Sequence, residues 1–159
     1  MIFITVGSQK FQFNRLLKAV DRLVENKKIT EDVFAQIGYS DYKPKNYEYK
    51  EFLDRNEFEI MISKCDILIT HGGTGAIING LKRDKKVIAV PRLKEYGEHV
   101  DNHQLQIIHE FEEMNFISAV YDLKDLEDYI NNIKCKEFNK YESNTINIIN
   151  SIDRFIESN

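Results

Sequence analysis

The chain of 159 residues has little cysteine and proline, no tryptophan and no excess of positive charge. Its net charge of -4 argues against a nucleic-acid partner, because binding to a phosphate backbone needs a basic surface. The two cysteines, Cys65 and Cys135, form no Cys-x-x-Cys pair and give no support to a disulfide framework. No apolar run approaches the roughly 20 residues that cross a bilayer. We therefore expect a cytoplasmic protein, whose contact with a membrane would come from a surface face or a partner.

Short apolar runs alternate with amphipathic stretches through most of the chain. Strands are expected at residues 2–6, 33–37, 47–53, 65–70, 86–90 and 116–121. Helices are expected at residues 13–24, 58–63, 76–83, 104–111 and 125–133. This alternation predicts an α/β domain with a parallel sheet and helices on both faces. A single domain is expected over residues 1–159, with a C-terminal helix over 139–159, where apolar residues recur at helical spacing.

The segment from Thr70 to Gly75 reads THGGTG and joins an expected strand to an expected helix. Its glycines let a ligand approach the backbone closely, and the helix start presents free N–H groups and a positive dipole end to an anion. A dinucleotide fingerprint would need glycine where Ile78 stands, and a P-loop would need Lys-Ser or Lys-Thr where Leu81-Lys82 stands. The segment therefore predicts an anion site of another kind, and the alternative is a tight turn without a ligand.

A polar loop runs from Arg92 to Gln104 and carries basic, acidic, imidazole and amide side chains. Amide and carboxylate groups suit sugar hydroxyls, which both donate and accept hydrogen bonds. The alternative is a solvated loop in which Asp101 or Asn102 caps the next helix.

Ligands of parallel α/β sheets bind beyond the carboxyl ends of the strands. The turns at residues 7–10, 71–75 and 92–102 all follow expected strands, so we expect them to meet at one edge of the sheet. The sequence thus predicts a composite site from these three turns.

Metal and nucleophile chemistry find little support. His99 and His103 are four residues apart, but they do not form His-Glu-x-x-His and no third ligand lies nearby in the sequence. Cys65 begins an expected buried strand, Cys135 has no evident base partner, and no Gly-x-Ser-x-Gly occurs. We expect neither a bound metal nor a cofactor.

Three segments in fixed order, HGGTG, then VPR, then GEHVDNHQ, resemble the C-terminal, donor-binding domain of glycosyltransferase family 28. The likeness runs from Met1 to about Tyr121. It is strongest to small free-standing subunits of bacterial capsule and exopolysaccharide synthesis. The eukaryotic subunit that helps to add the second GlcNAc to dolichol-linked GlcNAc is similar as well.

The resemblance implies the GT-B architecture, in which two Rossmann-like domains face each other and the C-terminal one holds the nucleotide sugar. In split members the partner supplies the acceptor domain and a membrane anchor, and transfer is inverting without a bound divalent metal. We therefore expect the donor-binding subunit of a two-component transferase at the inner face of the membrane. It would move galactose, glucose or GlcNAc from a UDP-sugar, which is a substrate and not a cofactor, to a lipid-linked saccharide.

The resemblance and the turn after the first strand together nominate the site residues. The expected substrate-binding residues are Gly7, Ser8, Gly72, Gly73, Thr74, Gly75, Asn79, Arg92, Asn102, His103 and Gln104. Asn79 stands where relatives carry a ribose-binding glutamate, and Arg92 is expected to pair with the diphosphate. His71 and Glu98 are the candidate catalytic bases, with a residue of the partner as the alternative.

Two other functions are compatible with parts of this pattern. A non-catalytic enhancer that stabilises a partner transferase would use its surface and need no donor site. A sugar-nucleotide epimerase shares the two-domain architecture, but it would need both domains and 159 residues are too few.

Overall fold

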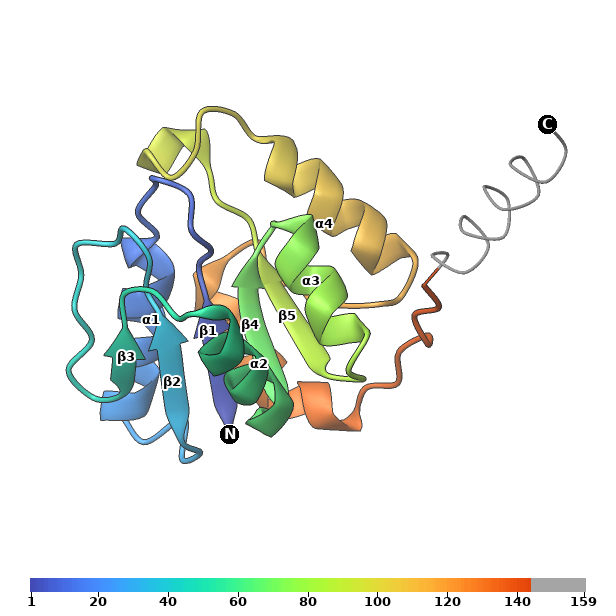
Figure 1. Ribbon diagram of the computed structural model, residues 1–159, viewed down its shortest axis with the longest axis horizontal. Coiled ribbons are helices and arrows are strands. Elements are labelled where there is room, and N and C mark those ends of the chain that lie inside the picture. Colours follow the sequence, from blue (N-terminus) through green and yellow to red (C-terminus); the bar gives the residue numbers. More distant parts are fainter. Residues whose placement is uncertain (144–159) are drawn as a thin grey trace, which may run out of the picture.

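The computed structural model describes residues 1–143, which form a six-stranded parallel sheet of order β3-β2-β1-β4-β5-β6 between two layers of helices (Figure 1). The strands are β1 (Ile2–Thr5), β2 (Val33–Gln36), β3 (Glu48–Lys50), β4 (Ile67–His71), β5 (Lys86–Val90) and β6 (Ser118–Ala119). The α-helices are α1 (Asn14–Glu25), α2 (Arg55–Lys64), α3 (Thr74–Leu81), α4 (His103–Glu113) and α5 (Leu126–Asn132). The α/β class and the parallel sheet expected from the sequence are confirmed.

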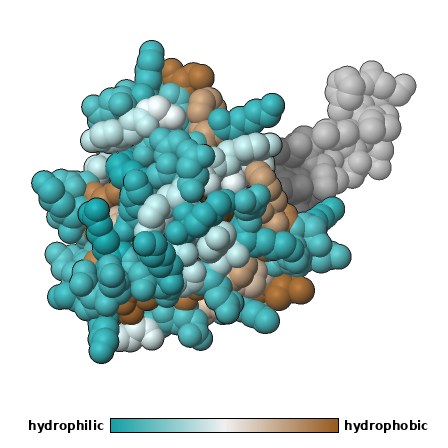
Figure 2. Space-filling model, turned by 90° about the vertical axis from the view of Figure 1, so that its left-hand side faces the viewer, coloured by the Kyte–Doolittle hydropathy of each residue, from teal (hydrophilic) through white to brown (hydrophobic). Residues whose placement is uncertain are grey.

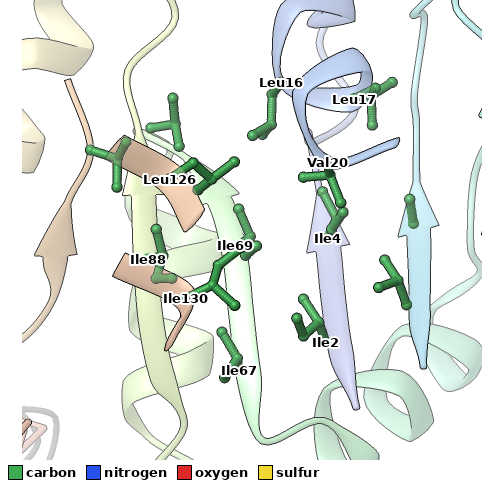
Figure 3. Close-up of a cluster of buried hydrophobic side chains, with 14 of the residues drawn as sticks. Ile2, Ile4, Leu16, Leu17, Val20, Ile67, Ile69, Ile88, Leu126 and Ile130 are labelled. Atoms are coloured by element: carbon green, nitrogen blue, oxygen red, sulfur yellow. The ribbon is translucent and has the colours of Figure 1, made fainter. Parts of the chain in front are cut away.

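One face of the sheet is covered by α1 and α5. Leu16 and Val20 of α1 pack above Ile4 of β1, while Leu126 and Ile130 of α5 lie over β4 and β5 (Figure 3). These side chains are almost wholly excluded from water, which is the main favourable term in folding.

The opposite face is covered by α2, α3 and α4. Phe3, which alternates with Ile2 and Ile4 along β1, points to this side and belongs to a second buried cluster with Ile77 of α3 and Ile108 of α4. The central strands are therefore buried on both faces, which explains why they read as continuous apolar runs. The edge strand β3 is exposed and carries charged residues, and Figure 2 shows that this side of the molecule is mostly hydrophilic.

Element bounds differ from the sequence expectations at several places. The helix expected at 58–63 begins at Arg55, because Asp54 accepts a hydrogen bond from the Glu57 amide and the Glu57 side chain accepts one from the Asp54 amide. The helix expected at 76–83 begins at Thr74, so Gly75 lies inside its first turn. The strands expected at 47–53 and 116–121 are shorter, and residues 139–143 are not helical. The rest of the expected C-terminal helix lies outside the described residues.

The strand order reverses between β1 and β4, so the connections after these two strands lead to opposite sides. Such a switch point opens a crevice at the carboxyl edge of the sheet. In Figure 1 this edge is uppermost, and the turns that follow β1, β4 and β5 all lie along it, as expected. Within residues 1–143, no helix is both long and apolar enough to span a bilayer.

Candidate functional site

A cavity of about 520 Å³ lies at the switch point, between the turn after β1, the helix α2 and the start of α3. Of the residues expected from the sequence, those that line it are Gly7, Ser8, His71, Gly73, Gly75 and Asn79. The remaining lining residues are Thr5, Gln9, Gln36, Leu53, Asp54, Arg55, Phe58, Glu59 and Ala76. The first and second glycine-containing turns therefore meet in one concave site.

His71 occupies the space between the two turns. A Cβ atom on Gly7 would lie 2.6 Å from Cε1 of His71, and a Cβ atom on Gly73 would overlap its Nε2 atom. Gly7 also has a φ of 76°, which other residues rarely adopt. The glycines at both positions are therefore required by the imidazole ring that they enclose.

A different neighbour, Gln104, requires a glycine at position 72. A Cβ atom there would lie 2.6 Å from the Cβ atom of Gln104 and 3.0 Å from its carbonyl oxygen. The Oε1 atom of Gln104 accepts hydrogen bonds from the amides of Gly72 and Arg92, each at 3.1 Å. This contact fixes the turn after β4 against the start of α4, and it confirms that the THGGTG turn and the loop from Arg92 to Gln104 lie side by side.

Gly75 is the glycine that the fold does not explain. A Cβ atom there would meet nothing within 4 Å, and its φ lies outside the left-handed region. Gly75 nevertheless lines the cavity, at a helical position where glycine is less favourable than alanine by about 0.5–1 kcal/mol. Its missing side chain leaves the first turn of α3 open to the cavity.

The N-terminus of α3 has free hydrogen-bonding capacity. Its N-cap residue, Gly73, has no side chain, and none among the described residues caps the helix. The first N–H groups of a helix lack partners within the helix, and its dipole is positive at this end. The arrangement suits an anion lying against Gly75.

The environment of His71 keeps its ring neutral at physiological pH. Burial lowers the pKa of His71 to about 4, and the positive charge of Arg92 adds to this effect, while a hydrogen bond with the backbone of Thr5 opposes it. An imidazole with so low a pKa is a weak proton acceptor. The geometry places His71 at the site but does not favour it as the catalytic base.

The surroundings of Glu98 contradict its expected role as a catalytic base. The side chain is fully buried and accepts two hydrogen bonds from Arg15, both at 3.0 Å, and one from the Leu93 amide at 3.0 Å. A carboxylate engaged in this way, and absent from the cavity lining, holds the loop after β5 against α1. A role as catalytic base is therefore not supported.

The position of Arg92 contradicts its expected pairing with the diphosphate. The expectation of direct pairing with a diphosphate assumed an exposed side chain, whereas Arg92 is fully buried beneath the turn after β1. Its Nη2 atom donates to the carbonyl oxygens of Val6 and Phe11. It therefore cannot touch a ligand in the cavity in this conformation.

Asn79 faces the cavity from α3, as expected. Its side-chain oxygen accepts a hydrogen bond from Arg83, which also forms an ion pair with Glu59 of α2. The Asn79 side-chain N–H donors have no hydrogen-bond partner among the described residues, and Glu59 lines the same cavity. Arg83 thus links polar groups of α3 and α2 that both line the cavity.

Three other expected residues do not line the cavity. Asn102 accepts a hydrogen bond from the Lys94 amide at 3.0 Å, His103 contacts Gln106, and Thr74 is exposed at the first position of α3. Their contact with a donor sugar remains a prediction.

The α2 side of the cavity was missed by sequence reasoning. Gln36 ends β2, Leu53 precedes α2, and Phe58 and Glu59 lie on that helix. The Asp54–Glu57 capping pair was a readable signal for where α2 begins. Nothing local showed that α2 faces the glycine turn, because that placement depends on the strand order.

A larger groove of about 1,040 Å³ runs beside α1 on the other face of the sheet. It includes Lys18, Arg22 and Tyr96 and contains none of the glycines. In the described part of the chain, no group of three or more His, Cys, Asp or Glu residues is placed to hold a metal ion.

Known proteins share parts of this sequence. A sequence model of the glycosyltransferase family 28 C-terminal domain matches residues 1–158. The UDP-N-acetylglucosamine transferase subunit ALG13 of Candida albicans is 34% identical over 91 residues, which are 57% of this chain and 29% of that protein. The subunit of the same name from Candida glabrata is 36% identical over 64 residues, 40% of this chain and 30% of that protein. The matched segments span less than a third of these relatives.

Solved structures share the fold at low sequence identity. The glycotransferase of kitacinnamycin superposes with a TM-score of 0.60 at 15% identity, over 83% of this chain and 34% of that one. MurG of Acinetobacter baumannii superposes with a TM-score of 0.58 at 14% identity, over 82% of this chain and 40% of that one. The solution structure of ALG13 gives 0.58 at 16% identity, over 89% of both chains. The expected fold, a Rossmann-like domain equivalent to one half of a GT-B glycosyltransferase, is confirmed.

Proposed function

The chain belongs to the glycosyltransferase family 28 C-terminal domain family, and from this premise we propose that its cavity binds the nucleotide part of a UDP-sugar. The observation that carries the proposal is Gly75, which has no packing or backbone reason to be glycine and lies in the uncapped first turn of α3. Amides at a helix N-terminus are a general solution for binding phosphate groups. The diphosphate would lie against this turn, with the turn at Gly7 and Ser8 on its other side.

The nucleoside would extend from the diphosphate toward α2. Leu53 and Phe58 supply the apolar surface that a uracil ring needs, and Gln36 supplies a polar group beside them. The ribose lies between base and diphosphate in any nucleotide, which brings it to the walls formed by Asn79 and Glu59. The carboxylate of Glu59 can accept hydrogen bonds from ribose hydroxyls, while Asn79 can donate them.

The hexose would leave the cavity toward the loop that ends at Gln104, where Asn102 and His103 are exposed. In the proposed reaction a hydroxyl oxygen of the acceptor attacks the anomeric carbon. The bond from that carbon to the diphosphate breaks, and UDP leaves with the electron pair. The helix amides stabilise the charge that develops on UDP, without a divalent metal. The hydroxyl proton passes to a base on the partner, since Glu98 is engaged and His71 is a weak acceptor.

We propose that this partner carries the acceptor-binding half and anchors the pair at the inner face of the membrane. The support is that the chain resembles proteins whose names describe them as transferase subunits. The acceptor would be a lipid-linked saccharide of capsule or exopolysaccharide synthesis, and the sugar galactose, glucose or GlcNAc.

The test is a transfer assay with the chain and its partner, using UDP-galactose, UDP-glucose and UDP-GlcNAc with a lipid-linked saccharide. We expect transfer from one donor, unaffected by EDTA, and a loss of activity in the Gly75→Ala variant. A non-catalytic enhancer would leave transfer intact in that variant, because its contribution would not depend on an open α3 terminus. Transfer that survives Gly75→Ala would therefore favour the enhancer.

A further inference from the structure

Arg92 is the largest of the fully buried side chains and lies directly under the turn that follows β1. Its Nη2 atom donates to the Val6 carbonyl at 2.6 Å and to the Phe11 carbonyl at 3.2 Å. These carbonyls flank residues 7–10, so one guanidinium group holds both ends of the turn. Gln104 fixes the other side of Arg92 by accepting a hydrogen bond from its backbone amide.

The protein compensates the charge and the hydrogen-bond donors of the Arg92 guanidinium only in part. Its Nε and Nη1 atoms are buried and have no hydrogen-bond partner among the described residues. The ring of Phe13 lies 5.5 Å from the guanidinium carbon. Glu98 favours the charged form of Arg92 without forming an ion pair with it, since that carboxylate is engaged with Arg15. Burying a cation with unused donors is unfavourable unless another group offsets it.

The charge persists in spite of burial. Desolvation lowers the pKa of Arg92 only to about 10, and the charge of Glu98 opposes this decrease, so the guanidinium is cationic at neutral pH. Its field reaches the cavity, because the charge of Arg92 is one cause of the low pKa of His71, which lines the cavity. The other charged or titratable groups that act on this pair are Glu98 and His99.

We propose that Arg92 is a positioning residue for the phosphate site, which fixes the turn at residues 7–10 and supplies positive potential to the cavity without touching the ligand. This inference rests on the proposed function, since the anion that responds to the potential is the diphosphate. In a site of low dielectric a buried charge acts over a longer range than an exposed one. A diphosphate in the cavity would offset the charge that the protein leaves uncompensated.

The experiment compares the wild-type chain with Arg92→Gln and Arg92→Lys, after thermal denaturation has shown which variants fold. The first readout is the pKa of His71, which is measured by an NMR titration in the absence of ligand. We expect Arg92→Gln to raise it, because a nearby positive charge is removed, and Arg92→Lys to leave it nearly unchanged. An unchanged pKa in Arg92→Gln would overturn the proposal.

The second readout is the affinity for UDP and for uridine, measured by calorimetry. We expect Arg92→Gln to weaken the binding of UDP about tenfold or more and to leave the binding of uridine unchanged, since only the diphosphate interacts with the charge. An equal loss for both ligands would mean that Arg92 merely supports the fold. If wild-type chain fails to bind UDP, the proposed function fails, while the pKa of His71 still tests the field of Arg92.

If Arg92→Gln does not fold, Arg92→Lys provides the test by itself. A buried lysine loses its proton at lower pH than arginine does. We then expect the affinity of Arg92→Lys for UDP to fall between pH 7 and about pH 8.5, relative to wild type, with no such fall for uridine. Parallel pH profiles for wild type and Arg92→Lys would overturn the proposal.

Discussion

The Oε1 atom of Gln104 lies 3.1 Å from the backbone nitrogen of Gly72 and accepts its hydrogen bond. The same oxygen accepts from the Arg92 amide, so one side chain joins the turn after β4, the end of β5 and the start of α4. The expectation that a glycine turn and an amide-bearing loop meet is confirmed by this contact. It also means that a change at Gln104 alters the framework of the site as well as any contact with the sugar.

The first prediction concerns this framework. Gln104→Met preserves volume but removes the acceptor, which leaves two buried amides without a partner. We expect the free energy of unfolding to fall by about 2 kcal/mol or more, measured by chemical denaturation. Gln104→Glu keeps an acceptor and serves as the matched control, with a smaller loss. Equal stability of Gln104→Met and wild type would show that the contact is dispensable.

The second prediction separates two glycines of one motif. Gly75→Ala places a methyl group in open space on a helix and should raise the free energy of unfolding by about 0.5–1 kcal/mol. Gly73→Ala forces a methyl group into the ring of His71 and should lower it by about 1–3 kcal/mol. Thermal denaturation of both variants checks the sign of each change. A destabilised Gly75→Ala protein would mean that this glycine serves the fold.

The third prediction follows from the low pKa of His71. The pKa is about 4 in the folded chain, against an ordinary value of 6.5, so the unfolded chain binds the proton more readily between these values. Stability from this group is complete above pH 6.5 and is lost as the pH falls toward 4. We expect a loss of about 2 kcal/mol between pH 7 and pH 5.

The matched variant is His71→Gln, in which this slope should disappear, although its absolute stability also changes. Denaturation curves at several pH values give the slope for both proteins. Identical slopes would contradict the neutral, buried state of His71.

The fourth prediction concerns Glu98. Glu98→Gln removes the charge from a fully buried carboxylate that is paired with Arg15, and we expect the free energy of unfolding to fall by about 3 kcal/mol. Glu95→Gln, in the same loop but exposed, should change it little. If Glu98→Gln abolished transfer at unchanged stability, Glu98 would be a catalytic base after all.

The sequence was a good guide to elements and to which turns meet. Continuous apolar runs such as residues 2–6 predicted the central strands, because burial on both faces leaves no polar alternation. The end of a strand also fixes the edge at which its following turn lies, and this is why Gly7 and Gly73 could be placed together before the fold was known.

The sequence was a poor guide to burial of charged residues. Arg92 and Glu98 stand in a polar loop and look like exposed ligand-binding groups. The partner that buries Glu98 is Arg15, 83 positions away, and the carbonyls that hold Arg92 belong to the turn after β1. Such pairing is decided by tertiary packing and leaves no local signal. The separate reasons for Gly72 and Gly73 were equally invisible, since each depends on a neighbour in space, and the open space beside Gly75 could not be read from the sequence either.

The most direct measurement is a titration of the isotopically labelled chain with UDP up to millimolar concentration, followed by amide NMR shifts in wild type and in Gly75→Ala. We predict that the largest shifts in wild type occur at Gly7, Ser8, Thr74 and Gly75, and that Gly75→Ala remains folded but responds at least tenfold more weakly. Shifts confined to the groove beside α1, or equal responses in the two proteins, would contradict a diphosphate bound at the start of α3.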